Sequence, residues 1–224
     1  GYPFQIVQTP KQLLIAYQFA NASRIVYMDP KTENAPIDFW MGWSRGRWEG
    51  DTLVIDVTGL NDRTWFDRAG NYHSDKMHVV ERYTRVAANQ LNYEATIEDP
   101  EVFTRPWKIR MPLHRQTDTP RLLEYQCQAE KEEQNGDFER DARTWYPAAA
   151  PAGNAPFDAR ASAPLPRPAV TGDIRRLPDG KPDISGWYEN DAGGANYGLE
   201  GAAQNFLTPA SRGIVVDPQD GSQQ

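Results

Sequence analysis

Cysteine, long apolar runs and an N-terminal leader are what this sequence of 224 residues lacks most clearly. Its single cysteine, Cys127, excludes a disulfide within the chain and a zinc site built from cysteines. No apolar run approaches the roughly 20 residues of a membrane-spanning helix, so we expect no membrane-spanning segment. With neither an initiating Met nor a signal peptide, we expect a mature, trimmed or partial chain.

Clustered positive charge is also missing. The 24 Lys and Arg residues are scattered and are outnumbered by 31 Asp and Glu residues, which gives a net charge of −7. Because nucleic acids are bound by clustered basic side chains, we expect no nucleic-acid partner. The sequence contains no Gly-x-Ser-x-Gly elbow, Cys–His pair, P-loop or dinucleotide fingerprint. This argues against hydrolase triads and nucleotide chemistry and leaves open whether the protein is an enzyme.

What the sequence does contain is alternation of apolar and polar residues. Residues 91–98 and 107–113 alternate in this way, which is typical of strands with one solvated face. Further strands are predicted over residues 4–8, 12–19, 24–28, 45–49, 52–57, 77–86 and 121–127. So many short consecutive strands predict an all-β fold, an antiparallel barrel or sandwich, of which a calycin-like barrel is one form.

The composition changes towards the C-terminal end. Residues 128–144 are predicted to form a short surface helix or a loop, and more than half of the 18 prolines follow them. We predict a β-rich core domain over residues 1–146, a Pro- and Ala-rich linker over 147–168, and an extended tail over 169–224. Since such a tail cannot offset its own ordering entropy, we expect it to dock on β structure. Its predicted apolar anchors are Ile184, Trp187, Tyr188, Phe206 and Leu207.

Several sequence blocks carry a resemblance to known proteins. They include PFQIVQTP at 3–10, GRWEGDTLVID at 46–56, HVVER at 78–82, RPW at 105–107, and RRLPDGKPDISGW at 175–187. In these blocks the chain resembles a large group of uncharacterised exported bacterial proteins with a β-rich core. The resemblance implies a secreted, periplasmic or cell-surface location, but it implies no reaction. It also suggests that Cys127 pairs with a cysteine outside this sequence, although a buried free thiol is the simpler interpretation.

The order of these blocks is reversed in this chain. In the resembled group the DGKPD segment precedes the core, whereas here it follows the core. The tail could complete its own core as in a circular permutation, enter a neighbouring subunit as a donated strand, or begin the next unit of a tandem repeat. A donated strand would join copies head to tail into a ring or a fibre. The first functional hypothesis is therefore an exported structural or assembly protein whose partners are copies of itself.

The second hypothesis is a periplasmic metal- or small-ligand-binding protein or enzyme. Two of the three histidines fall close together, and a divalent metal, the only cofactor considered, could be held by His73, Asp75, His78 and Glu81. Strand alternation puts His78 and Glu81 on opposite faces, so the metal site would need a bulge. The alternative is a structural polar network, in which His78 and Glu81 satisfy neighbouring loops.

Aromatic and acidic side chains supply the remaining candidates. We predict ligand binding by Trp65, Arg82 and Trp48, in a cleft to which Trp40, Trp43 and Trp107 could contribute, although aromatic residues also pack sheet faces. The carboxylates that could form a general acid–base pair are those of Asp56, Asp62, Asp67 and Asp75. Turns are the favoured interpretation of the Asn61-Asp62 and Asp67-Arg68 pairs.

Overall fold

The computed structural model describes residues 3–66, 70–116, 122, 172–190 and 214–217. The chain divides into two compact units, one made of residues 1–122 and 170–224 and the other of residues 123–169. Every described residue belongs to the first unit. Cys127, the predicted helix or loop over 128–144, and the linker therefore lie outside the described residues. Within the described part, no helix is long and apolar enough to cross a lipid bilayer.

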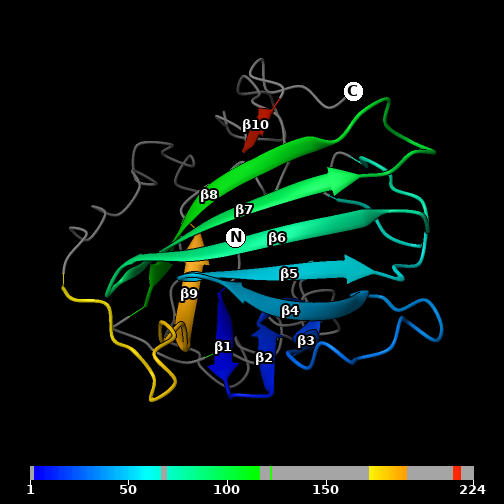
Figure 1. Ribbon diagram of the computed structural model, residues 1–224. Coiled ribbons are helices and arrows are strands. Elements are labelled where there is room, and N and C mark those ends of the chain that lie inside the picture. Colours follow the sequence, from blue (N-terminus) through cyan, green and yellow to red (C-terminus); the bar gives the residue numbers. More distant parts are fainter. Residues whose placement is uncertain (1–2, 67–69, 117–121, 123–171, 191–213, 218–224) are drawn as a thin grey trace, which may run out of the picture. The chain divides into compact units, whose positions relative to one another are not determined.

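Ten strands and one short 3₁₀ helix, η1, make up the regular structure of the described residues (Figure 1). In chain order the elements are β1 (Phe4–Gln8), β2 (Gln12–Tyr17), η1 (Phe19–Asn21), β3 (Ser23–Tyr27), β4 (Trp43–Glu49), β5 (Thr52–Thr58), β6 (His78–Ala87), β7 (Gln90–Glu98), β8 (Trp107–Arg115), β9 (Gly186–Asn190) and β10 (Val215–Asp217). The predicted all-β fold is confirmed. The strand predicted over 121–127 lies outside the described residues except for Leu122, which is not in a strand.

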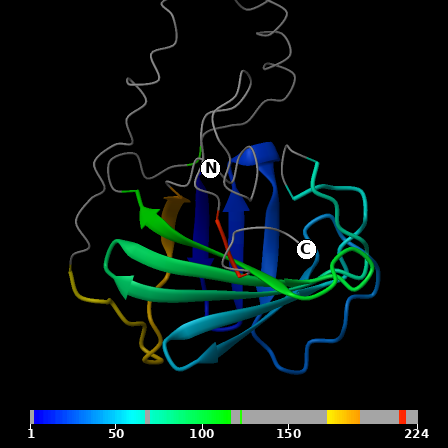
Figure 2. The same ribbon diagram turned by 90° about the horizontal axis from the view of Figure 1, so that it is seen from above.

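The sheet closes into a barrel of nine strands. Neighbouring strands follow the order β8-β7-β6-β5-β4-β3-β2-β1-β9, and β9 returns to pair with β8. Strand β9 is antiparallel to β1 on one side and to β8 on the other, and in Figure 2 it lies beside β1. Strand β10 pairs with another part of β8. The closing strand thus comes from the segment predicted as a docking tail.

One pairing in the barrel departs from the antiparallel arrangement that the sequence predicted. Strands β3 and β4 run parallel, although only Val26 with Ser44 and Tyr27 with Arg45 form register pairs. A parallel pair cannot be joined by a tight turn, because the chain must return to the starting end of the first strand. Residues 28–42 are long enough to make this connection, and they become one wall of the site described below.

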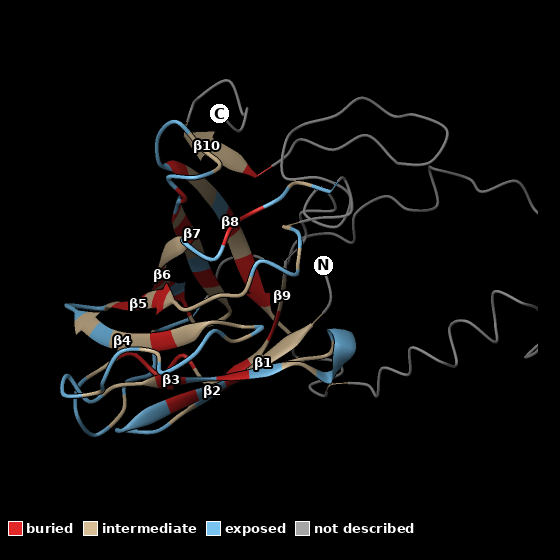
Figure 3. Ribbon diagram, turned by 90° about the vertical axis from the view of Figure 1, so that its right-hand side faces the viewer, coloured by how far each residue is buried: buried red, intermediate tan, exposed pale blue. Residues whose placement is uncertain are grey.

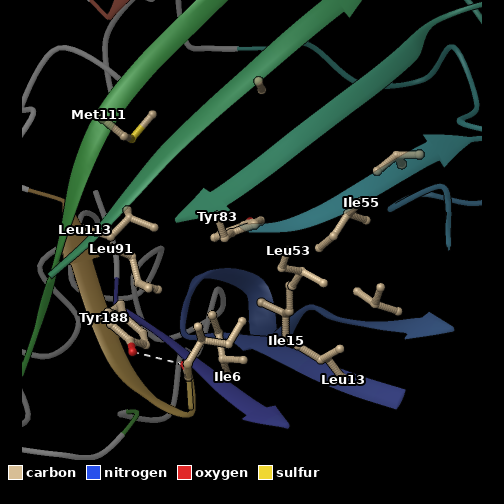
Figure 4. Close-up of a cluster of buried hydrophobic side chains, with 14 of the residues drawn as sticks. Ile6, Leu13, Ile15, Leu53, Ile55, Tyr83, Leu91, Met111, Leu113 and Tyr188 are labelled. Carbon is tan, nitrogen blue, oxygen red and sulfur yellow. Dashed lines mark hydrogen bonds between the residues drawn. The ribbon is translucent and has the colours of Figure 1, made fainter. Parts of the chain in front are cut away.

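Most side chains in the barrel interior are apolar, as the alternation of side chains predicts. In β7, Leu91, Ala95 and Ile97 are buried, and in β8 Trp107 and Leu113 are buried. Figure 3 shows buried positions alternating with more exposed ones along the strands, and Figure 4 shows the core side chains meeting between opposite walls. Burying this much apolar surface is the main force that closes the barrel.

The segment that leads into β9 closes one end of the barrel. Ile184 and Tyr188 are fully buried, and the Tyr188 hydroxyl donates to the carbonyl oxygen of Ile184 at 3.0 Å (Figure 4). Gln8 holds the segment from β1, because its Oε1 accepts the Ile184 amide at 2.9 Å and its own amide donates to Ser185 Oγ at 3.3 Å. The docking predicted for Ile184 and Tyr188 is therefore seen within one chain, whereas Phe206 and Leu207 lie outside the described residues.

Two ion pairs and a turn fasten this segment further. Arg176 donates to both carboxylate oxygens of Asp51 in the β4–β5 turn, and Arg175 pairs with Asp183 at 3.3 Å. The Leu177 amide donates to the carbonyl oxygen of Lys181 at 2.9 Å, which makes a compact turn. We call this end of the barrel, covered by residues 172–185, the closed end.

The opposite end, which we call the open end, is built from three longer connections: residues 28–42, 59–77 and 99–106 (Figure 1, right-hand side). The Phe39 amide donates to the carbonyl oxygen of Gly59 at 2.7 Å, which ties the first connection to the second. Gly59 has φ +62°, and a Cβ there would lie 2.6 Å from the Cβ of Ala35, so only glycine allows this approach. The carboxylate of Asp99 accepts the amide and hydroxyl of Ser74 at 2.6 and 2.8 Å and joins the third connection to the second.

Candidate functional site

A cleft of about 540 Å³ opens at the open end of the barrel. Its walls come from the two connections that follow β3 and β5. The residues that line it are Ile37, Asp38, Phe39, Trp40, Asn61, Asp62, Arg63 and Asp75. The mouth of a β-barrel is a common place for a small-molecule site, and this volume is in the range of such sites.

Backbone and aromatic contacts hold the walls of the cleft in place. Asn61 Oδ1 accepts the Arg63 amide at 3.0 Å, which confirms the turn predicted for the Asn61-Asp62 pair. On the other wall, the ring of Phe39 stacks on Trp43 at 5.5 Å, and Trp43 stacks in turn on Tyr27 of β3 at 4.7 Å. The lining is therefore anchored to the barrel through the stacked rings of Phe39, Trp43 and Tyr27.

Large apolar side chains at the open end are unusually exposed. Ile37, Trp40 and Trp65 are 65, 62 and 64% exposed, and no other large apolar side chain in the described residues is more than half exposed. Tyr72 pairs with Trp65 through an isolated bridge and is also exposed. Exposed apolar surface is unfavourable in water and often marks a binding surface when it gathers in one place. Of these side chains, Ile37 and Trp40 line the cleft beside its polar groups.

The charge of the cleft is mainly negative. Three carboxylates line it, those of Asp38, Asp62 and Asp75, against the single guanidinium of Arg63. Asp75 is already paired, at 3.0 Å, with the ammonium of Lys76. The pKa of Tyr72 is raised, first by partial burial and then by the negative charges of Asp62 and other nearby carboxylates. The open end therefore carries a negative field that a ligand entering the cleft would meet.

His73 lies beneath the open end as a structural side chain. It is buried, with Nε2 2.8 Å from Thr64 Oγ1 and Nδ1 3.1 Å from the carbonyl oxygen of Ser74. Because a carbonyl oxygen can only accept, Nδ1 carries the proton and Nε2 accepts from the Thr64 hydroxyl. The Phe66 ring lies edge-on to the imidazole at 5.3 Å. Both nitrogens of His73 are thus occupied by the protein itself.

The structure does not bring the four predicted metal ligands together. His78 points outward from β6, 3.0 Å from Asp56, whereas Glu81 is buried inside the barrel, so the predicted opposite faces are confirmed. Asp75 lines the cleft, and His73 lies buried under it. Among the residues that the structure describes, there is no group of three or more His, Cys, Asp or Glu side chains that could hold a metal ion.

The predicted ligand-binding residues are also dispersed. Trp48 packs against the apolar core, and Arg82 points outward to pair with Glu49 at 2.9 Å. Trp65 lies at the open end but is not part of the cleft lining. Of the aromatic residues weighed from the sequence, Trp40 does line the cleft, while Trp107 is buried. The sequence analysis named neither Ile37, Asp38, Phe39 nor Arg63 as candidates. An apolar residue such as Ile37 in a long connection rich in turn residues is a signal that could have indicated the site.

A buried ion pair inside the barrel was not predicted at all. Arg24 of β3 and Glu81 of β6 are both buried, with Arg24 Nη2 2.5 Å from Glu81 Oε2. The hydroxyl of Tyr93 donates to Glu81 Oε1 at 2.9 Å, and that of Tyr83 lies 3.5 Å from the same atom. Arg24 also reaches Ser44 Oγ at 3.4 Å. Glu81 thus belongs to a polar network, as one interpretation held, but its partners lie on strands β3, β6 and β7 and not in loops.

The surroundings of this network keep its tyrosines protonated. Burial raises the pKa of Tyr83 and Tyr93 well above the ordinary value, and the negative charge of Glu81 raises it further. Burial by itself would lower the pKa of Arg24, but the adjacent Glu81 carboxylate raises it well above the usual value. Arg24 therefore stays charged and the tyrosines stay neutral across the physiological range, which suits a structural role.

The fold and the cleft together define a closed all-β barrel with one open, aromatic and acidic end. Comparisons with known proteins add no relative: no family model, no curated protein and no solved structure matches the chain significantly. The resemblance drawn from the sequence blocks therefore stays a prediction.

Proposed function

We propose that this chain is an exported protein that binds a small ligand in the cleft at the open end of its barrel. The observation that carries the proposal is the lining of the cleft, where Ile37 and Trp40 are exposed beside the charged side chains of Asp38, Asp62 and Arg63. Apolar walls supply binding energy, and a few convergent polar groups supply orientation. The export part of the proposal is supported by the resemblance of the sequence blocks alone.

The rest of the barrel supports this use of the open end. The closed end is sealed by the buried side chains of Ile184 and Tyr188, so the barrel offers a rigid scaffold for the connections opposite. A site held by a rigid scaffold loses little conformational entropy when it binds. Packing within the described residues does not explain why the side chains of Trp40 and Ile37 are exposed.

The test is a ligand screen of the full chain by thermal shift and tryptophan fluorescence, because a ligand that binds only the folded state raises its stability. Any compound that stabilises the chain is then tested on two variants, Trp40→Ala and Trp65→Ala. Binding should be lost in Trp40→Ala and kept in Trp65→Ala, whose side chain is equally exposed but outside the lining. Equal losses in both variants, or no loss in Trp40→Ala, would overturn the proposed site.

Strand exchange between copies is a second candidate function. Strand β9 is held by β1 and β8 and is reached only after residues 117–171, so a copy could place its own β9 in the slot of another copy. The contacts of Ile184, Trp187 and Tyr188 would be the same in either arrangement. Successive exchange would generate the head-to-tail oligomer or fibre that the sequence suggested, with copies of this chain as partners.

Light scattering on the intact chain over a wide concentration range tests this candidate. Exchange predicts dimers or larger particles, and these should dissociate in the variant Ile184→Asp/Tyr188→Asp, which removes the buried anchors. A chain ending at Pro168 lacks β9, and adding a synthetic peptide of residues 172–190 should restore its cooperative unfolding. A strictly monomeric intact chain at every concentration would contradict assembly and leave β9 as a strand that completes its own barrel.

A further inference from the structure

The two carboxylates of the cleft that lack a partner indicate what kind of ligand it accepts. Within the described part of the chain, neither Asp38 nor Asp62 makes an ion pair or a side-chain hydrogen bond, whereas Asp75 is paired with Lys76. Unpaired charges in a cleft are normally balanced by solvent in the free protein and by the ligand in the complex. The exposed indole of Trp40 lines the same cleft.

We propose that the ligand is a small organic cation, an ammonium group attached to an apolar or aromatic body. This inference rests on the proposed ligand-binding function and names the class of ligand. The ammonium would lie between the carboxylates of Asp38 and Asp62, and the apolar body would cover Ile37 and Trp40. A cation over the face of a tryptophan is attracted by the ring as well as by nearby carboxylates.

The other classes of small ligand fit the cleft less well. An anion would be attracted by Arg63 and by the neighbouring Lys76 ammonium, but Lys76 is already paired with Asp75, and three carboxylates of the lining would repel the anion. A neutral aromatic molecule could cover the exposed apolar side chains, but it would leave both unpaired carboxylates without a counter-charge and partly desolvated. A bare divalent cation would use neither Trp40 nor Ile37. Only an organic cation satisfies both the charged and the apolar parts of the lining.

Arg63 allows a test in which a substitution is expected to increase the affinity for the ligand. Its guanidinium shares the cleft with the proposed ammonium site, and it makes no ion pair among the described residues. Because like charges repel, Arg63 should weaken the binding of an organic cation. Removing its charge should therefore strengthen binding, whereas a residue with a purely structural role would weaken binding or leave it unchanged when substituted.

The experiment compares three probes of similar size that differ in charge: 2-phenylethylammonium, 2-phenylethanol and 3-phenylpropionate. Each is titrated into the full chain at neutral pH and low salt, with tryptophan fluorescence and calorimetry as the readouts. We expect the ammonium to bind at least about tenfold more tightly than the alcohol, and the carboxylate to bind more weakly than either. Added salt should reduce the difference, since the charges are exposed.

Three variants then locate the effect. Asp38→Asn should weaken binding of the ammonium about fivefold, as expected for one exposed charge about 4 Å from another. Glu33→Gln is the matched control, because Glu33 is an exposed acid in the same connection but outside the cleft lining. It should leave the affinity unchanged. Arg63→Gln should raise the affinity for the ammonium, and none of the three variants should change the affinity for the alcohol.

The outcomes separate the inference from the function on which it rests. If all three probes bind equally, or if Arg63→Gln weakens binding of the ammonium, the inference of a cationic ligand is overturned while the cleft remains a ligand site. If none of the probes binds, the inference of a cationic ligand is overturned, and the ligand screen of the full chain alone decides whether the cleft binds a small ligand. Preference for the ammonium that is equally reduced in Glu33→Gln would show a general effect of net charge and would also overturn the inference.

Discussion

The two ends of the barrel contain the same kinds of residues, but these residues differ in burial and in ion pairing. At the closed end Ile184 is fully buried and Arg176 is paired with Asp51. At the open end Ile37 is 65% exposed, and neither Asp38 nor Arg63 has an ion-pair partner in the described residues. One end satisfies its apolar and charged groups within the chain, and the other leaves them for solvent or a ligand.

The part of the molecule that stabilises the barrel is thus separate from the part that we propose binds a ligand. The closed end stabilises the barrel because its segment removes apolar surface from water and supplies hydrogen bonds to the edges of both β1 and β8. The open end keeps its connections in place through backbone contacts such as Phe39 to Gly59 and buried side-chain contacts such as Asp99 to Ser74. An exposed side chain such as Ile37 can therefore be changed without loss of the fold. Substitutions at the two ends should therefore have very different effects.

The largest effect is expected from removing the closing strand. A chain that ends at Pro168 lacks β9 and the segment over the closed end, so the edges of β1 and β8 and the core around Ile6 become exposed. We expect loss of cooperative unfolding or aggregation, measured by near-ultraviolet circular dichroism and light scattering. A truncated chain that stays monomeric and unfolds as cooperatively as the intact chain would break the comparison between the ends.

The next effect concerns the interior between the two ends. Glu81→Gln leaves the charge of Arg24 buried without its partner, and we expect a loss of about 3–5 kcal/mol in the free energy of unfolding. Arg82→Gln removes the exposed pair with Glu49 on the outer face of the same strand and should cost less than about 1 kcal/mol. Denaturant unfolding measures both. Replacing both members of the buried pair, as Arg24→Met/Glu81→Leu, should cost less than Glu81→Gln alone; the opposite order would contradict this account.

A matched pair of isoleucines tests the comparison directly. Ile184→Ala removes a fully buried side chain and should cost about 2–5 kcal/mol, because it leaves a cavity at the closed end. Ile37→Ala removes a side chain that is mostly in solvent, and its effect should stay within about 0.5 kcal/mol. Thermal and urea unfolding of the two variants give the difference. Similar losses would mean that the open end contributes to stability as much as the closed end does.

The smallest effect is a dependence on pH. The hydrogen bond from Arg176 lowers the pKa of Asp51, so this contact stabilises the closed end fully above the ordinary carboxyl pKa of about 4. The contribution should disappear as the pH falls through the lowered pKa of the folded state. Stability measured between pH 6 and pH 2 should therefore fall slightly more in the intact chain than in Asp51→Asn. Parallel curves would show that the Arg176–Asp51 pair contributes nothing to stability, as is the case for many exposed ion pairs.

Much of the fold could be read from the sequence, but the site could not. Alternation placed His78 and Glu81 on opposite faces of one strand, and the structure confirms it. Alternation could not predict that Glu81 contacts Arg24, because the two residues are 57 positions apart. An arginine without a neighbouring acid in the sequence is also expected to be exposed. The candidate metal ligands were grouped by their proximity in the sequence, but the structure separates them. His78 lies on the outer face of β6, Asp75 in the cleft lining, His73 in a buried loop position and Glu81 in the barrel interior.

Strands β1 to β8 and the direction in which their side chains point could be predicted from the sequence, since both depend on residues close together in the chain. Strands β9 and β10 lie in the segment predicted as an extended tail. The parallel pairing of β3 with β4, the closure of the barrel by β9, and the meeting of residues 37–40 with 61–63 in one cleft were decided by the tertiary structure. Each of these features depends on segments that are distant in the sequence and bury apolar surface together. A local pattern does not indicate which distant segment will be the partner.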